Sequence, residues 1–185
     1  MWHNPIKYIE AIRRRRNYPK QLTYLGMAAI LMGLSAALGM NAISALSTTS
    51  PAATGISVAV VAFVGGLFVS WLFSLGMGML GGHGEFYEGL ASLSYPLVIF
   101  SVGLFVAALS SYAGYIGMLI SFLALTTCGM LSYTALFRAT KEMFRVDMLT
   151  AFIGVSALFA VIMFSVFGAS TIGTLSSFMP MVPSA

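Results

Sequence analysis

Five long apolar runs without a charged side chain dominate this sequence, and they restrict what it can fold into. They cover residues 22–46, 55–80, 89–110, 112–137 and 148–175. A helix needs about 20 mostly apolar residues to cross the hydrocarbon core of a bilayer, and each run is long enough. Spanning strands would instead show segments of about ten residues with alternating polarity, and that pattern is absent. We therefore predict an all-α integral membrane protein, a bundle of five transmembrane helices.

The composition agrees with a bilayer as the solvent. Of the 185 residues, 59% are hydrophobic and 8% are charged, whereas ordinary soluble domains carry about 25% charged residues. A single compact bundle, residues 22–175, is expected at this length. Cys128 is the only cysteine, so the chain has no disulfide framework and no pair of soft metal ligands. The sequence gives no reason to expect a cofactor or a nucleic-acid partner.

The positions of the charges predict the topology. With five spans and a cytosolic N-terminus, all nine basic residues fall on the cytosolic side, as the positive-inside rule requires. The five acidic residues fall there too. The opposite side holds a Ser/Thr-rich loop at residues 47–51 and the tail at residues 176–185, neither of which carries a charged side chain. We expect a multi-pass protein of the cell membrane of a prokaryote, with its C-terminus outside.

Residues 1–21 form a cytosolic basic and amphipathic segment. Ile6, Ile9 and Ile12 recur at a spacing of three, and Asn4-Pro5 precedes them, which favours a short helix lying in the membrane interface. The apolar run that follows is too long for a cleaved signal peptide. Basic side chains near the membrane surface attract anionic lipid. The predicted headgroup-binding residues are Arg13, Arg14, Arg15, Arg16 and Lys20.

A row of small residues marks the second span at intervals of four. Small residues at this spacing let another helix approach closely in lipid. Packing within the bundle is the ordinary interpretation, and a homodimer interface is the alternative. The row consists of Gly66, Ser70, Ser74, Gly78 and Gly82.

The turn at residues 81–88 is the most distinctive connection. It places His83, Glu85 and Glu88 at the membrane surface. Three ligands in one flexible loop make a poor metal site, and the two acids are better explained as residues that complement the dipole of the third span. The loop at residues 138–147 lies on the same side, either as an amphipathic surface helix or as a helical extension of the fourth span. We predict a partner-binding surface in which Glu85 and Glu88 approach basic residues of that loop, namely Arg138, Lys141 and Arg145.

The turn also carries a family resemblance. A Gly-Gly-x-Gly-x-Phe turn followed by Tyr-Pro resembles the Yip domain family of five-span, Rab/Ypt-interacting-protein-like membrane proteins. The matching residues are Gly81, Gly82, Gly84, Phe86, Tyr95 and Pro96. The resemblance implies that relatives in eukaryotes act in traffic between endoplasmic reticulum and Golgi and bind small GTPases of the Rab class. Those relatives carry a longer N-terminal region, so the GTPase role does not transfer directly, and a short prokaryotic-type member is expected.

Three classes of function can be compared. An enzyme is disfavoured because the chain contains no metalloprotease, nucleophile-elbow or phosphate-loop motif. A small transporter or channel component, built as a homodimer, is the alternative, although intramembrane charges usually mark ion pathways and the spans contain none. We predict a non-enzymatic scaffold or adaptor. Its expected partners are another integral membrane protein or membrane complex, anionic lipid, and a second copy of itself.

Overall fold

The computed structural model describes residues 16–43, 50–82 and 84–161, and these residues form helices without any strand. Helix α2 is Tyr18–Ile43 and α3 is Pro51–Met79. Helix α4 is Phe86–Ser110, the 3-10 helix η2 is Ser111–Ala113, and α5 is Gly114–Phe144. A further apolar helix is described over Met148–Val161. The expectation of an all-helical chain is confirmed for the part of the sequence that the structure describes.

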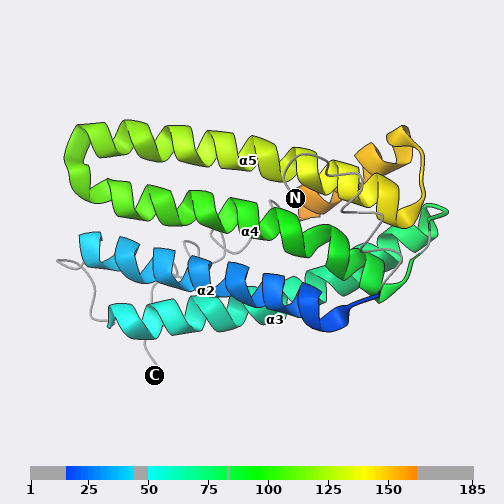
Figure 1. Ribbon diagram of the computed structural model, residues 1–185, viewed down its shortest axis with the longest axis horizontal. Helices are drawn as coiled ribbons and strands as arrows, with labels where there is room; N and C mark the ends of the chain where they lie inside the picture. The colour runs from blue at the N-terminus through cyan, green and yellow to red at the C-terminus, as the bar shows by residue number, and fades with distance from the viewer. Residues whose placement is uncertain (1–15, 44–49, 83, 162–185) are drawn as a thin grey trace, which may run out of the picture.

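The helices pack as two antiparallel pairs (Figure 1). Helix α4 lies between α5 and α2, and α3 packs mainly on α2. Gly114 has a φ of +61°, a conformation that costs glycine little, and this allows the chain to reverse between α4 and α5. The Ser110 and Ser121 hydroxyls are 2.7 Å apart across this reversal. The short junction after residue 110 therefore produces a tight hairpin, as its length predicts.

Three helical stretches are long and apolar enough to cross a membrane, namely Tyr18–Gly39, Pro51–Met79 and Phe86–Phe144. The last one folds back at η2, so it contains both α4 and α5. The predicted fifth span begins with the helix Met148–Val161, and residues 162–175 lie outside the described residues. Of the two forms expected for residues 138–147, the structure shows the helical extension of the fourth span, because α5 continues to Phe144.

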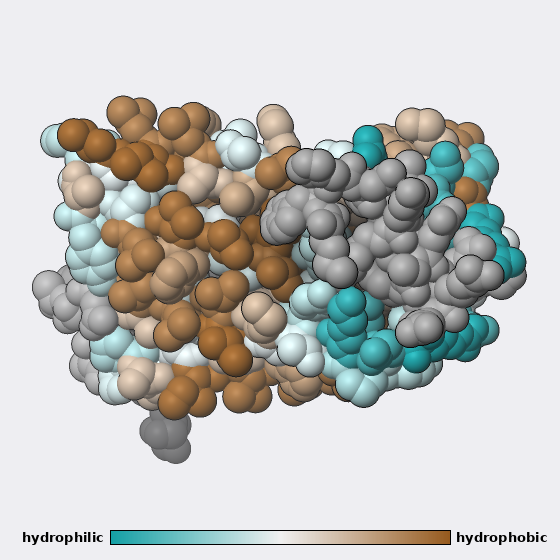
Figure 2. Space-filling model, viewed as in Figure 1, coloured by the Kyte–Doolittle hydropathy of each residue, from teal (hydrophilic) through white to brown (hydrophobic). Residues whose placement is uncertain are grey.

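The core lies at one end of the bundle. Buried apolar side chains from α3, α4, α5 and the helix Met148–Val161 meet there, among them Phe73, Met77, Tyr87, Phe144 and Val155. The same end holds the charged residues that the structure describes, and we call it the charged end. The other end exposes large apolar side chains, as the brown surface in Figure 2 shows. A surface of this kind is stable when lipid rather than water covers it.

Small residues set the distance between neighbouring helices in the apolar half. A Cβ on Gly33 of α2 would lie 2.5 Å from the carbonyl oxygen of Gly55 in α3. A Cβ on Gly103 of α4 would lie 2.5 Å from the Cβ of Cys128 in α5. Close backbone approach through small side chains is the usual way in which helices associate in lipid. The lone cysteine is thus a small packing residue at the α4–α5 contact.

Candidate functional site

The charged end is built around the turn between α3 and α4. Gly81 adopts a φ of +86°, and the amide N–H of Gly82 donates to the carbonyl of Met77 at 3.0 Å. A Cβ on Gly84 would lie 2.8 Å from the Cα of Gly78. The glycines therefore end α3 with a left-handed residue and let the chain pass directly beside it. The turn is compact, and the first residues of α4 after Phe86 are buried in the bundle.

Glu85 and Glu88 form a capping box at the start of α4. The amide N–H of Glu85 donates to the Glu88 carboxylate at 3.4 Å, while the Glu85 side chain accepts from the backbone of Glu88. Glu88 is only 8% exposed. The backbone N–H groups of Glu85 and Glu88 are thereby hydrogen-bonded at the helix start. The expectation that these acids complement α4 is confirmed.

Glu85 also pairs with Arg16, which precedes α2. The hydrogen bond to the Glu85 side chain, and then the charge of the same carboxylate, raise the pKa of the Arg16 guanidinium above its ordinary value. Both side chains are about half exposed, so water screens the pair and its contribution to stability is small. Its structural effect is to connect the segment before α2 with the start of α4.

Tyr87 strengthens the same connection from inside the bundle. Its hydroxyl accepts a hydrogen bond from the amide N–H of Asn17 at 3.2 Å. Its ring packs edge to face on Tyr18, with ring centroids 4.9 Å apart. Asn17 in turn caps α2, since its side chain accepts from the amide of Lys20. No sequence motif includes Tyr87. The only indication in the sequence was that Tyr87 directly follows Phe86, the last residue of the glycine-turn motif.

Several buried polar side chains lie inside the bundle near this end. The Ser94 hydroxyl donates to the side-chain carbonyl of Gln21 at 2.7 Å, and both residues are fully buried. The amide nitrogen of Gln21 and the hydroxyl of Thr140 have no partner among the described residues. No sequence pattern indicated these three residues, because Gln21 precedes the first apolar run, Ser94 resembles an ordinary span residue, and Thr140 falls in the predicted loop at residues 138–147.

The row of small residues in α3 is used inside the bundle. A Cβ on Gly89 of α4 would lie 2.3 Å from the carbonyl oxygen of Ser70, and one on Gly66 would lie 2.7 Å from the Leu25 side chain. Ser74 is buried, and Gly82 packs beside Phe144. These contacts support the packing interpretation of the row over a homodimer interface.

No ion pair joins the predicted acidic and basic residues in the part of the charged end that the structure describes. The carboxylate of Glu85 pairs with Arg16. Among the described residues, Arg138, Lys141 and Arg145 form no ion pair, and all three are exposed. Arg138 and Lys141 lie on the side of α5 opposite its buried residues, among them Ala139 and Met143. His83 and residues 13–15 lie outside the described residues.

The remaining motif residues have separate structural roles. Phe86 is exposed at the first position of α4. Pro96 is buried inside α4, which continues through it as a helix, and the hydroxyl of Ser132 in α5 donates to the Pro96 carbonyl at 2.8 Å. Tyr95 is half-buried next to it. The Pro96 carbonyl therefore contributes to the contact between α4 and α5.

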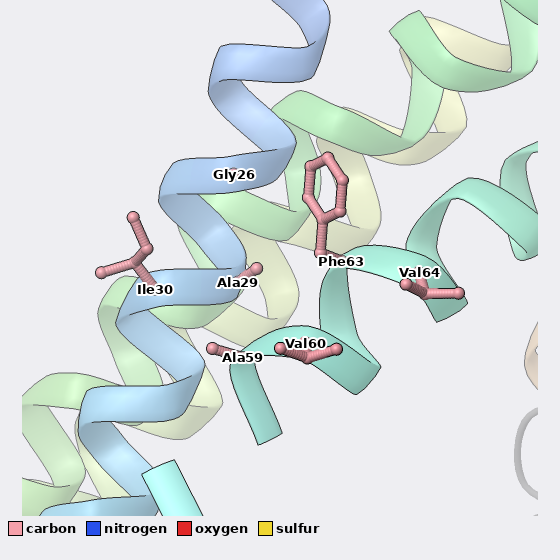
Figure 3. A pocket seen from close by; sticks show the side chains of 7 residues that line it. All are labelled: Gly26, Ala29, Ile30, Ala59, Val60, Phe63 and Val64. Carbon is pink, nitrogen blue, oxygen red and sulfur yellow. The ribbon is translucent and has the colours of Figure 1, made fainter. Parts of the chain in front are cut away.

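An open apolar groove lies between α2 and α3 (Figure 3). Its volume is about 280 Å³. Figure 3 shows Phe63 and Ala59 of α3 facing Gly26 and Ala29 of α2. No lining residue has a polar side chain, so the groove cannot orient a charged or hydrogen-bonding substrate. The lining residues are Gly26, Ala29, Ile30, Ala59, Val60, Phe63 and Val64.

Comparison with protein families identifies the bundle. The model of the Yip1 domain matches residues 1–169, which is most of the chain. The protein belongs to the Yip1 domain family. The resemblance carried by the glycine turn and the Tyr-Pro pair is thereby confirmed, and the Yip1 domain includes every helix described above. With its long apolar helices it is a membrane protein. Comparisons with curated proteins and with solved structures found no match.

Proposed function

We propose that this Yip1-domain protein is a non-enzymatic membrane scaffold or adaptor, which binds another integral membrane protein or membrane complex. The observation that supports the proposal is the division of its surface. The described charged residues gather at one end, and exposed large hydrophobic side chains cover much of the rest of the face seen in Figure 2. In the described residues no group of three or more potential metal ligands occurs. Such a molecule offers surfaces for binding rather than groups for chemistry.

The proposed topology has five spans, with the charged end in the cytosol and the C-terminus outside, in the cell membrane of a prokaryote. The distribution of the nine basic residues supports this orientation. The three apolar helical stretches fit four of the spans, because the stretch Phe86–Phe144 is a hairpin. In the proposed topology, the apolar helix Met148–Val161 begins the fifth span.

An exposed aromatic pair on α3 is the best candidate for the intramembrane contact with a partner. Phe68 and Trp71 lie with ring centroids 5.9 Å apart, and both are exposed. Large aromatic side chains dominate the binding energy of many protein interfaces. Neither ring belongs to the buried core. Their removal therefore leaves the bundle intact and changes only the outer surface.

The experiment is affinity capture from gently solubilised membranes, carried out with the wild type and with Phe68→Ala/Trp71→Ala. We expect a stoichiometric membrane partner that the double variant loses, with an unchanged melting temperature for the isolated protein. The matched control is Tyr115→Ala, which removes an exposed aromatic side chain of α5. Solute flux in liposomes containing the purified protein, with no stoichiometric partner, would instead support the transporter alternative.

A further inference from the structure

Arg138, Lys141 and Arg145 form a basic stripe along the C-terminal end of α5. At 3.6 residues per turn, the first two lie within about 60° of each other around the helix axis, and Arg145 follows as the C-terminal cap. The buried residues Ala139 and Met143 occupy the opposite side. The three cations therefore face outward together, and none forms an ion pair among the described residues.

The backbone of Arg145 is the unusual feature of this stripe. Its φ of 53° makes it the only non-glycine residue with a positive φ in the described part of the chain. A left-handed residue at a helix C-terminus is usually glycine, because a side chain strains this conformation. The turn into the helix Met148–Val161 needs the backbone shape but not the guanidinium. A strained residue that the turn does not require points to a function of its side chain.

The outward face of α5 continues from the stripe as an apolar surface. Leu131, Leu123 and Ile116 follow along the same side of the helix, and they are 56%, 63% and 70% exposed. At the far end stands Tyr115, which is 92% exposed, and exposed tyrosines mark the membrane interface. Because an α-helix rises about 1.5 Å per residue, Arg138 lies about 35 Å from Tyr115 along the axis of α5. The hydrocarbon core is about 30 Å thick, so Arg138 emerges at the level of the opposite headgroups.

We propose that α5 binds an anionic phospholipid, with the headgroup phosphate held by Arg138, Lys141 and Arg145 and an acyl chain along Leu131 and Leu123. An apolar face that ends in a group of cations matches the two parts of such a lipid, whereas an acidic protein segment would match only the cationic end. The helix dipole favours cations only in the last turn, and Arg138 precedes that turn. The positive-inside rule needs cations on one side of the membrane, not on one face of a helix.

The test uses the full-length protein in detergent with added phosphatidylglycerol or phosphatidylcholine, and it measures melting temperature and bound lipid by native mass spectrometry. We expect phosphatidylglycerol to bind more tightly and to raise the melting temperature more. Each cation near an anionic surface contributes about fivefold in affinity, so Arg138→Gln/Lys141→Gln should weaken phosphatidylglycerol binding by about 25-fold. Both changes are at exposed positions, and the melting temperature in phosphatidylcholine shows whether the fold is intact.

Two further variants separate the stripe from net charge and from the fold. Lys141→Gln/Glu142→Gln keeps the net charge, so a response to net charge alone predicts unchanged phosphatidylglycerol binding. We expect weaker binding, because Lys141 belongs to the stripe and Glu142 does not. Arg145→Gly relieves the left-handed strain, so we expect a higher melting temperature in phosphatidylcholine but a smaller gain from phosphatidylglycerol. Equal binding of the two lipids by the wild type would overturn the proposal, as would unchanged lipid preference in Arg138→Gln/Lys141→Gln. Equal stabilisation by soluble glycerol phosphate would show that the ligand is a free anion, not a lipid.

Discussion

Thr140 carries a hydroxyl that is fully buried and has no hydrogen-bond partner among the described residues. An unpaired buried polar group lowers stability, since it loses its bond to water and gains none in the protein. We expect Thr140→Val, which keeps the shape of the side chain, to raise the free energy of unfolding by about 1 kcal/mol. Chemical denaturation in detergent measures it. Thr134→Val is the control, because Thr134 is exposed and bonded to the Met130 carbonyl. A loss of stability in Thr140→Val would mean that this hydroxyl has a partner.

Asp147 makes the stability depend on pH through the start of the helix Met148–Val161. Its side chain accepts from the amide N–H of Thr150 at 3.3 Å, and the side-chain hydrogen bond with Thr150 lowers the pKa of the carboxyl below its ordinary value. A lowered folded pKa means that the stabilisation is present above the unfolded pKa of about 4 and is lost as pH falls through the folded pKa.

We therefore expect the wild type to lose more stability between about pH 5 and about pH 3 than Asp147→Asn does. Asparagine also caps a helix but does not titrate, so the two proteins should melt alike at neutral pH. Asp147→Ala should be less stable at every pH. Melting curves in detergent at a series of pH values give the comparison. Parallel pH profiles for the wild type and Asp147→Asn would contradict the assigned role.

At the scale of elements, the contact between α3 and α4 depends on Gly89. A Cβ there would meet the backbone carbonyl of Ser70 at 2.3 Å and the Ser74 side chain at 3.0 Å, so the helices must separate. We expect Gly89→Ala to lower the free energy of unfolding by about 1–3 kcal/mol. Gly76→Ala is the matched control, since nothing lies within 4 Å of its Cβ position. Similar melting of the two variants would show that α3 and α4 adjust at little cost.

At the scale of the whole molecule, the proposed orientation has a direct test. A reporter that is active only outside the cytosol is fused after successive positions along the chain. We expect activity after Ser50, in the connection between α2 and α3, and none after Gly84 or Lys141, which belong to the charged end. The basic residues resist transfer across the membrane, and this decides the orientation. Activity after Gly84 would contradict the five-span arrangement.

The sequence by itself determined the helices and the family. Apolar runs of sufficient length must be helical in a bilayer, because every backbone polar group there needs an internal partner. The runs therefore predicted α3, α4 and the hairpin, and the glycine turn with its Tyr-Pro pair predicted the family that the comparison confirmed. Helix formation and the family motif both depend on the local sequence, and neither depends on which helices lie next to one another.

Only the tertiary structure decided which side chains meet. The charge pattern of the sequence predicted that Glu85 approaches the cations of α5. The Glu85 carboxylate instead pairs with Arg16, and the α5 cations are exposed. The bond between Gln21 and Ser94 joins residues far apart in the chain, and no local pattern could indicate it. In a sequence so uniformly apolar, the hydrophobic pattern does not show which face of a helix is buried. Close contacts at small residues such as Gly89 fix that face, and the bundle as a whole determines them.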